Sequence, residues 1–518
     1  MVQYLDNNNS GFATWNANRG AMKKRSGLGF LWWFIIFMAA WWAIGIFIGN
    51  KTKTDIAPET DIVETDVSAV PVNKIVSDKI SADVRGLRVS NVDLHDFPDG
   101  ATTVKLLGGE NDFIEVGVTA NGTTAPVADT VWKTDGDKYT WRNTDGVDFN
   151  RTVSVNGYVI TIKDEIKNNT KRDLSFAPYA RVRRANDKVS SAGVYTGAVA
   201  YANGDIEHDD WRAIAKKPRA YTTTNGFAGF ADQYWETVAS IDASDQTIRA
   251  QKVGDLYSTD TIARPVAAAA GDVVSIETHI FTGPRDSSVL KNVAPIINGI
   301  DKTIDYGWFW FLAMPMLWLI NAINSIVMNY GIAIIIMTIL LRLLMWPLTR
   351  KSYTSMAAMQ KMQPEMQRIQ KLYANDKARM QMEIMKLYQT HKTSPMSGCL
   401  PMLIQIPIFF ALYKALLISV QMRNAHFLWI SDLAAMDPYF ILPILMGASM
   451  WLQQRLQSGA LKSADKNDVA AQTQRAMRWM PIIFTVMFAW MPAGLVLYWT
   501  VSNLFGILQM YIIKRNMK

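Results

Sequence analysis

One charged residue inside a long apolar run most constrains what this chain can fold into. Residues 331–347 read GIAIIIMTILLRLLMWP, and Arg342 is the only charge among them. Such a run is typical of a membrane-spanning helix. A charge in hydrocarbon costs several kcal/mol, so these residues usually face a bundle interior or a watery cavity. We therefore expect Arg342 to line a polar space in a helical membrane domain, with snorkelling to the cytoplasmic headgroups as the alternative.

Charge is divided unevenly along the chain. The 518 residues contain 53 Lys and Arg against 45 Asp and Glu, a net charge of +8. Residues 51–305 alone have a net charge of −8, so the rest of the chain has +16. The positive excess lies in the ends and short loops of the apolar part, as is typical of loops that stay in the cytoplasm. This favours a membrane protein over a nucleic-acid-binding protein, and we expect no DNA partner.

Cysteine and histidine usage excludes several kinds of site. The single cysteine, Cys399, excludes an intrachain disulfide framework and a cysteine-based zinc or iron–sulfur site. The five histidines are scattered, and the sequence contains no GxxxxGKS or GxxxxGKT phosphate-binding loop. We therefore expect no metal site and no cofactor.

Changes in hydropathy and charge divide the chain into segments. Short runs such as YVITI (158–162) and FAGFA (227–231) predict an all-β sandwich outside the cytoplasm. The apolar segments predict a multi-pass α-helical membrane protein with six transmembrane helices and both termini in the cytoplasm. The expected order is a cytoplasmic lead (1–26), a transmembrane anchor (27–49), a linker (50–73), the β-sandwich domain (74–305), an interfacial amphipathic helix (306–328), a transmembrane helix with Arg342 (329–349), a cytoplasmic helical hairpin (350–397), transmembrane helices at 398–421 and 438–453, a cytoplasmic loop (454–478), two transmembrane helices within 479–513 and a basic tail (514–518).

The interfacial helix has a competing interpretation, because residues 306–349 are long enough for two crossings. The first part is rich in Trp and Phe, contains Pro315 and carries Asn321 and Asn324, a pattern that suits the headgroup region. A crossing here would place the basic segment 350–397 outside the cytoplasm, against the charge bias. We therefore expect one crossing, at about 330–349.

Methionines form a stripe on the first helix of the predicted hairpin. Met356, Met359, Met362 and Met366 recur every three or four residues. A methionine stripe is suited to contact with varied apolar partners. The alternative is that it packs the two arms of the hairpin together. The sequence leaves both interpretations open.

Further side chains are candidates for the polar space of Arg342. Thr338 lies one turn before Arg342, and the others, on later helices, are Gln405, Gln454 and Trp499. Helix packing and interhelical hydrogen bonds are the alternatives. Lys414 lies near the outer end of its helix, and we expect it to reach outward rather than into the bundle.

Several longer runs carry a family resemblance. They are IDYGWFWF (304–311), MWPLT (345–349), TSMAAMQKMQPEM (354–366), GCLPMLIQIPIFFALYKAL (398–416), LWISDL (428–433), DPYFILPILMGASM (437–450) and MFAWMPAGLVLYWTVSN (487–503). In these runs the chain resembles the YidC membrane protein insertase family, of the Gram-negative type with a large periplasmic domain.

The resemblance implies an insertase and chaperone of the bacterial inner membrane, not an enzyme. It implies a five-helix core around a hydrophilic groove open to the cytoplasm, where Arg342 attracts polar parts of a nascent chain. The hairpin is expected to be required for insertion. The implied partners are nascent membrane proteins, the ribosome, the signal recognition particle with its receptor, the Sec translocon and the lipid bilayer.

Two other classes of function make different demands on the sequence. A transporter would show inverted repeats, and the sequence contains no internal repeat. A membrane-anchored carbohydrate-active enzyme would need paired carboxylates in the sandwich. Glu207, His208, Asp209 and Asp210 cluster, but a solvated loop is the simpler interpretation.

Overall fold

The computed structural model describes residues 54–55, 65–109, 111–185, 194–391, 400–457 and 469–515. The predicted lead (1–26) and transmembrane anchor (27–49) lie outside these residues, as do parts of the predicted linker, cytoplasmic loop and tail. The described residues belong to two compact units. The β-domain unit covers residues 52–330 and 404–425, and the helical unit covers residues 331–403 and 426–518.

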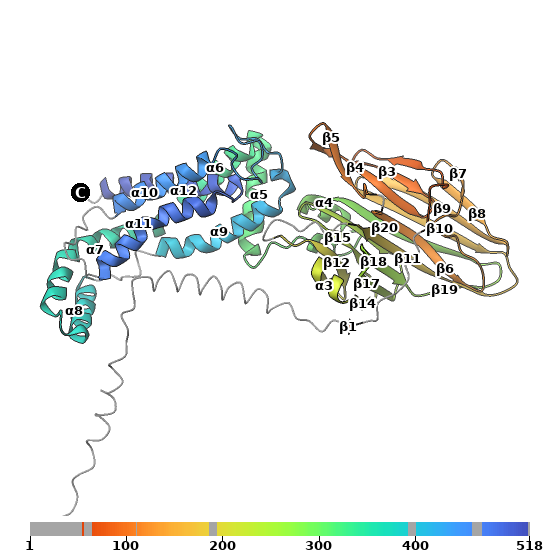
Figure 1. Cartoon of the computed structure of the whole chain (residues 1–518), viewed down its shortest axis with the longest axis horizontal. Helices are drawn as coiled ribbons and strands as arrows, with labels where there is room; N and C mark the ends of the chain where they lie inside the picture. Colours follow the sequence, from red (N-terminus) through yellow and green to blue (C-terminus); the bar gives the residue numbers. More distant parts are fainter. Residues whose placement is uncertain are drawn as a thin grey trace, which may run out of the picture. The chain divides into compact units, whose positions relative to one another are not determined.

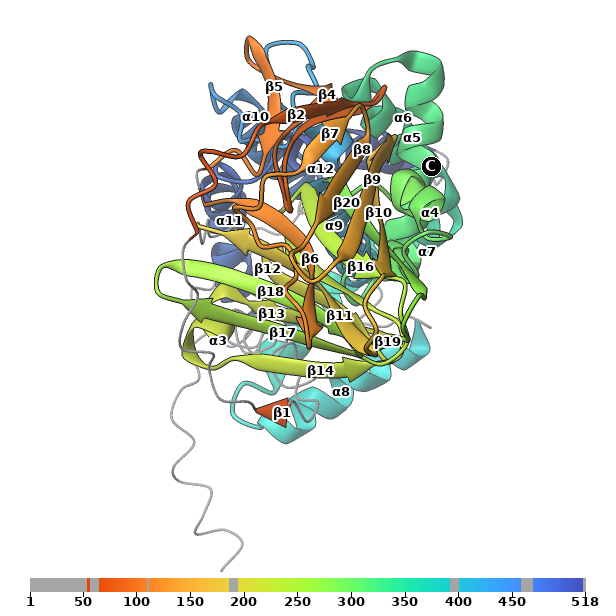
Figure 2. The ribbon, with the colours of Figure 1, turned by 90° about the vertical axis from the view of Figure 1, so that its right-hand side faces the viewer.

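The first sheet of the β-domain unit has 11 strands among the described residues (Figure 1). Its pairs are antiparallel, and β1 lies at the edge beyond β14 (Figure 2). In spatial order the strands are β1 (Thr54–Asp55), β14 (Arg219–Thr223), β17 (Gln246–Val253), β18 (Leu256–Ala263), β11 (Leu174–Arg184), β6 (Phe113–Asn121), β4 (Arg88–Asp99), β3 (Ile80–Arg85) and β2 (Asn73–Val76), with β19 (Val266–Ala268) paired to β11 and β5 (Thr102–Leu106) paired to β4.

The second sheet has nine strands among the residues that the structure describes. The predicted runs YVITI and FAGFA lie in β10 and β15 of this sheet. The order is β13 (Asp205–Asp210), β12 (Gly197–Ala202), β15 (Phe227–Ala231), β16 (Trp235–Ile241), β20 (Val273–Pro284), β10 (Val159–Asn168), β9 (Val147–Asn156), β8 (Lys138–Arg142) and β7 (Lys133–Asp135).

The two sheets pack face to face, because strands β11 and β18 of the first contact β15 and β16 of the second. Side chains alternate between faces along a strand. In β11 the apolar side chains Phe176, Ala180 and Val182 are buried, while Tyr179 and Arg181 lie on the opposite face. The alternation supplies one apolar layer between the sheets, and the predicted sandwich is confirmed.

The β-domain unit also contains helices, and two of them have an aspartate as their N-cap. The side chain of Asp210 accepts a hydrogen bond from the backbone N–H of Ala213, and Asp286 accepts from Ser288 and Val289, as N-caps do. The helices of this unit are α3 (Trp211–Lys216), α4 (Ser287–Val293), η1 (Ile300–Lys302), α5 (Trp310–Val327), most of α9 (Leu400–Ile418) and η3 (Val420–Met422).

The helical unit contains α6 (Tyr330–Leu344), α7 (Trp346–Leu372), α8 (Lys377–Thr390), α10 (Ile441–Gln457), α11 (Val469–Phe488) and α12 (Ala493–Arg515). Helices α7 and α8 occupy most of the predicted hairpin (350–397), and the side chain of Asp376 between them accepts a hydrogen bond from the N–H of Arg379 at 3.0 Å. The predicted helix 329–349 is interrupted at Met345, where α6 meets α7.

Judged by length and composition alone, few of the described helices could span a membrane. Among the described residues, α5 and α12 are long and apolar enough to cross a membrane. Helix α6 with residues 346–359 of α7 forms a third candidate, bent by 62°. Because α5 has the length of a crossing, the interfacial helix stays a prediction, and so does the count of six spanning helices.

Close backbone approach packs α10 against its neighbours. A Cβ at Gly447 of α10 would overlap the hydroxyl of Thr485 on α11, so only glycine fits there without a shift. The amide of Asn503 on α12 donates to the Ser449 hydroxyl of α10 at 3.1 Å. Small residues and interhelical hydrogen bonds are typical of packed membrane helices.

Candidate functional site

Arg342 forms hydrogen bonds with α12 at two points. It lies in the last turn of α6, and its Nε donates to the Ser502 hydroxyl at 2.8 Å. Its backbone carbonyl accepts from the Gln509 amide at 3.0 Å. Positions 502 and 509 are two turns apart and therefore lie on one face of α12. The side chain is thus directed toward a neighbouring helix, which favours the inward orientation over snorkelling.

Among the residues that the structure describes, no carboxylate pairs with the guanidinium of Arg342. Within the described ranges, Arg342 forms no ion pair and is half-buried. Gly506 of α12 lies close to this group, since a Cβ there would lie 3.9 Å from Nη1 of Arg342 and 3.3 Å from the Gln453 amide nitrogen. A half-buried cation without an ion pair is suited to attract an anionic or polar group.

The polar residues around Arg342 include several that the sequence did not identify. Ser502 and Gln509 are buried on α12, and the Gln509 Oε1 atom is buried without a hydrogen-bond partner in the described part of the chain. The hydroxyl of Tyr353 on α7 donates to the carbonyl of Gly506 at 3.4 Å. The available signal was the spacing of Ser502, Gly506 and Gln509 at i, i+4 and i+7 in an apolar helix.

Two of the predicted groove residues are used in packing. Thr338 is fully buried, and its hydroxyl donates to the Ile334 carbonyl of the same helix, so it presents no hydroxyl to an open space. This favours helix packing, the alternative interpretation, over a place on a groove surface. Trp499 is half-buried, and its ring centroid lies 5.2 Å from that of Phe488 and 5.9 Å from that of Phe484. Trp499 therefore packs α12 against α11.

The two glutamines fall on different units. Gln454 is half-buried on α10 of the helical unit. Gln405 is half-buried on α9, in the part that belongs to the β-domain unit. Their contact with a substrate stays a prediction.

The methionine stripe of α7 faces the protein. Met356 packs against a cluster that contains Met510 and Ile513 of α12, and Met362 is 4% exposed. The sulfur of Met366 accepts a hydrogen bond from the Tyr388 hydroxyl of α8 at 3.3 Å, and Met359 is half-buried. The packing interpretation is therefore the better one. The exposed methionines of the hairpin are Met382 and Met385 on α8, with 58% and 60% exposure.

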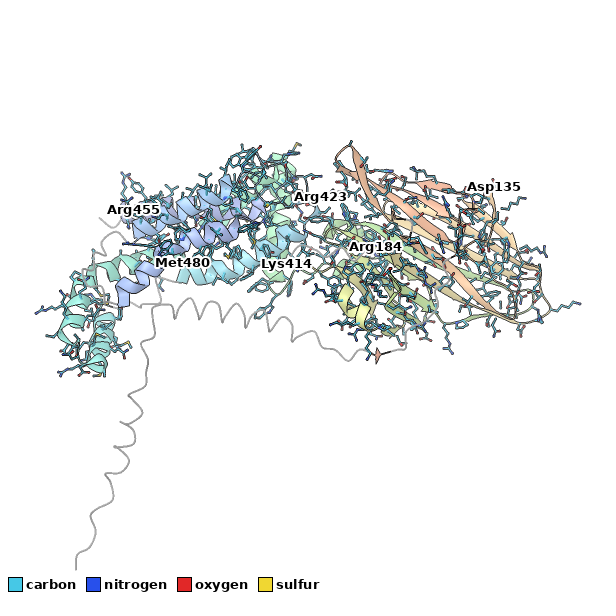
Figure 3. The ribbon with its side chains drawn as sticks, viewed as in Figure 1. Asp135, Arg184, Lys414, Arg423, Arg455 and Met480 are labelled. Atoms are coloured by element: carbon cyan, nitrogen blue, oxygen red, sulfur yellow. The ribbon has the colours of Figure 1, made fainter. Side chains whose placement is uncertain are left out.

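Lys414 is directed toward the β-domain. This residue of α9, labelled in Figure 3, pairs with Asp305 at 2.8 Å between Nζ and Oδ2. Burial acts to raise the pKa of Asp305, but the charge and hydrogen bond of Lys414 outweigh it, so the pKa is lower than usual. Gln233 donates to the Leu417 carbonyl at 2.9 Å nearby. This ion pair favours the outward orientation over the bundle-facing alternative.

The acidic cluster of the sandwich is not a solvated loop. Residues 205–210 form strand β13, and Asp209 is 3% exposed. Its carboxylate accepts a hydrogen bond from the Tyr221 hydroxyl and lies 3.7 Å from Nε of Arg219. The loop interpretation is wrong, because strand pairing with β12 buries this position.

Comparison with known proteins covers nearly all of the described chain. Residues 322–518 match the family described as 60Kd inner membrane protein, and residues 74–319 match the YidC periplasmic domain. The membrane protein insertase YidC of Magnetococcus marinus is 36% identical over 446 residues, which cover 81% of this chain and 77% of that protein. That of Aromatoleum aromaticum is 35% identical over 488 residues, or 90% and 85% of the two chains.

A crystal structure of an active YidC insertase with its first transmembrane domain resolved is also similar, with 19% identity and a TM-score of 0.36. The match covers 86% of this chain and 94% of that chain. The sequence relatives are named as insertases and not as enzymes. Since this chain spans most of their length at more than a third identity, it is an inner-membrane protein with a periplasmic β-rich domain and belongs to the YidC family of membrane protein insertases.

Proposed function

We propose that this chain inserts nascent membrane proteins into the bacterial inner membrane and assists their folding, with Arg342 as the contact for their polar parts. The observation that carries the proposal is the half-buried guanidinium of Arg342, held by Ser502 and without an ion pair in the described residues. A half-buried charge without an ion pair among the described residues is costly, and a transient anionic or polar occupant would offset this cost.

The energetics of insertion explain why such a contact is useful. A substrate helix must carry its polar flank across the hydrocarbon, where each unsatisfied polar group costs several kcal/mol. A polar groove open to the cytoplasm shortens the dry path, and a fixed cation in it attracts an acidic or hydroxyl-rich tail. Burial of the apolar substrate segment in lipid then favours release into the bilayer.

In this proposal the chain crosses the membrane six times, with both termini in the cytoplasm. Five helices enclose the groove, residues 27–49 are the additional anchor, and residues 306–328 lie at the membrane surface. The basic short segments support this topology, because positively charged loops remain inside. The β-domain then lies in the periplasm.

The cytoplasmic partners of the proposal are the ribosome, the signal recognition particle with its receptor, and the Sec translocon. Residues 350–397, which include the α7–α8 hairpin, carry nine Lys and Arg against three Asp and Glu. A basic surface is suited to contact with the RNA of a ribosome or of a recognition particle. The chain acts alone or with the translocon.

Purified chain in liposomes provides the direct test. We expect liposomes with the chain to insert a short single-span substrate at least several-fold more efficiently than liposomes with an unrelated multi-pass protein at the same protein-to-lipid ratio. Protease protection of the translocated tail is the measurement. Equal insertion in the two preparations would refute the proposal.

Exposed methionines of α8 are expected to contact the nascent chain. A photo-crosslinking residue in place of Met382 or Met385 should capture a stalled nascent chain, because flexible thioethers at 58% and 60% exposure suit varied apolar segments. The matched control is Met362 on α7, which is 4% exposed and should give no adduct. No capture at either α8 position during active insertion, or capture at position 362, would contradict this expectation.

A further inference from the structure

The outer face of the first sheet carries a row of alternating charges. Cross-strand pairing places Arg249 (β17) beside Asp260 (β18), Asp260 beside Arg181 (β11), Arg181 beside Glu115 (β6) and Glu115 beside Arg88 (β4). Directly opposite side chains on neighbouring strands lie close enough to interact. The row therefore crosses five adjacent strands, and each carboxylate lies between two guanidinium groups.

The carboxylates of this row are already engaged by their neighbours. Arg88 Nε lies 2.9 Å from Glu115 Oε2, and the Tyr179 hydroxyl donates to Glu115 Oε1 at 3.2 Å. Arg181 Nε lies 2.5 Å from Asp260 Oδ1, which also accepts from the Ser258 hydroxyl at 3.1 Å. Each carboxylate thus already has a guanidinium partner, and within the described residues neither forms an ion pair with a further cation on this face.

Arg183 is that further cation. It lies two residues after Arg181 on β11, opposite Ser258 of β18 and Phe113 of β6. Its residue is 3% exposed, and its buried Nε has no hydrogen-bond partner in the residues that the structure describes. The next residue, Arg184, labelled in Figure 3, pairs with Asp232 at 3.1 Å. Arg183 has no corresponding ion pair within the described ranges.

The surroundings of Arg183 only partly compensate its charge. The guanidinium carbon lies 5.6 Å from the centre of the Phe113 ring, a favourable contact for a cation. Burial and then the neighbouring charge of Arg181 lower the pKa of Arg183 from its usual value. The site would therefore be stabilised by an added negative charge.

The cavity in front of these residues has a volume of about 160 Å³. This is small beside the roughly 300–1,000 Å³ of typical ligand sites, so only a small ligand fits it. Arg88, Arg181 and Arg183 line it together with Glu115 and Tyr179, so three cations face one carboxylate. The lining thus offers an excess of positive charge.

We propose that this cavity binds a small soluble molecule that carries an oxyanion, a carboxylate or a phosphate, together with at least one hydroxyl group. The oxyanion accepts hydrogen bonds from the guanidinium groups, for which planar bidentate contacts are favourable. The hydroxyl group supplies a donor for the Glu115 carboxylate, which lines the cavity and whose oxygens can each accept more than one hydrogen bond. This binding activity is separate from membrane insertion and does not depend on it.

A purely structural role for Arg183 is the competing explanation, and it makes a different prediction. If Arg183 serves to bind a ligand, its buried charge lowers the stability of the ligand-free protein. Its replacement by an apolar side chain of similar length is then neutral or stabilising. A ligand-binding role predicts that Arg183→Met keeps the thermal midpoint of the ligand-free protein but removes binding. A structural role predicts a lower midpoint.

Calorimetric titration of the full chain in detergent micelles tests the proposal. The probes are D-glucuronate and glycerol 3-phosphate, with the neutral molecules D-glucose and glycerol as their counterparts. We expect saturable binding of at least one anion, at least tenfold weaker binding of its neutral counterpart, and at least a tenfold loss of affinity in Arg183→Gln. The matched control is Arg264→Gln, an exposed ion-paired arginine of the same domain, which should bind as the unmodified chain does.

Thermal unfolding of the same proteins completes the test. The anion that binds should raise the midpoint of the unmodified chain but not that of Arg183→Met, since a ligand stabilises only a protein that binds it. Lack of saturable binding by both anions would overturn the proposal. So would equal binding by Arg183→Gln, or a markedly lower ligand-free midpoint for Arg183→Met.

Discussion

Arg342→Ala should lower insertion of an acidic-tailed substrate at least tenfold, Arg342→Glu should lower it further, and Arg342→Lys should retain most of it. Two charges about 4 Å apart attract by about 1 kcal/mol in water and about 4 kcal/mol near a protein surface. A tenfold effect needs about 1.4 kcal/mol. Lysine keeps the charge but not the planar donors of arginine, so we expect some loss even for Arg342→Lys.

The measurement is the translocated fraction of two substrates that differ only in the charge of the tail. Arg350→Ala is the matched control, because Arg350 is an exposed cation of the following helix. Ser502→Ala removes the hydrogen bond that positions Nε but keeps the charge, so its loss should be smaller than that of Arg342→Ala. Equal insertion of the acidic-tailed substrate by all variants would exclude a role for the charge of Arg342.

Opposite pH dependences should appear when Glu236 or His208 of the β-domain is replaced. Burial raises the pKa of Glu236 from 4.5 to about 7, although Arg285 and the hydroxyl of Thr303 oppose it. Burial and then the charge of Arg285 lower the pKa of His208 from 6.5 to about 4. Each shift corresponds to about 3 kcal/mol of differential stability between protonation states.

The contributions of Glu236 and His208 to the free energy of unfolding change with pH in opposite directions. The contribution of Glu236 is fully present below pH 4.5 and is lost as the pH rises through about 7. The contribution of His208 is present above pH 6.5 and is lost as the pH falls through about 4. In the unmodified chain these changes largely cancel between pH 4.5 and 6.5.

Replacement of either residue should therefore reveal the pH dependence of stability that the other residue contributes. In Glu236→Gln the free energy of unfolding should rise with pH between about 4 and 6.5, and in His208→Gln it should fall between about 4.5 and 7. Thermal unfolding of the full chain from pH 4 to pH 8 is the measurement, with exposed Glu165→Gln as the control. Profiles of both variants parallel to that of the unmodified chain would show that neither group has the assigned pKa.

Local sequence signals predicted the parts of this fold that depend on neighbouring residues. The β-rich runs lie in strands because alternating apolar residues need a sheet to be buried against. Helix α8 begins after Asp376, a residue type that caps helices. Arg342 was identifiable because a single charge in an apolar run is rare.

Other features depend on which distant segments become neighbours. Met356 and Met362 were identified as a stripe, but a stripe does not show whether solvent or Met510 and Ile513 face it. Ser502 and Gln509 look like ordinary packing residues until α6 is placed against α12. The charge row that isolates Arg183 depends on the register of strands far apart in sequence, which no local pattern encodes.

The pair between Lys414 and Asp305 has a practical consequence for shortening the protein. Asp305 lies at the junction between the β-sandwich and α5, so a deletion of the periplasmic domain that ends after residue 305 removes the counterion of Lys414. The ammonium group would then be left without its carboxylate at the outer end of α9. A deletion that ends before Thr303 keeps this pair, and a comparison of the two deletions would separate the loss of the domain from the loss of one ion pair.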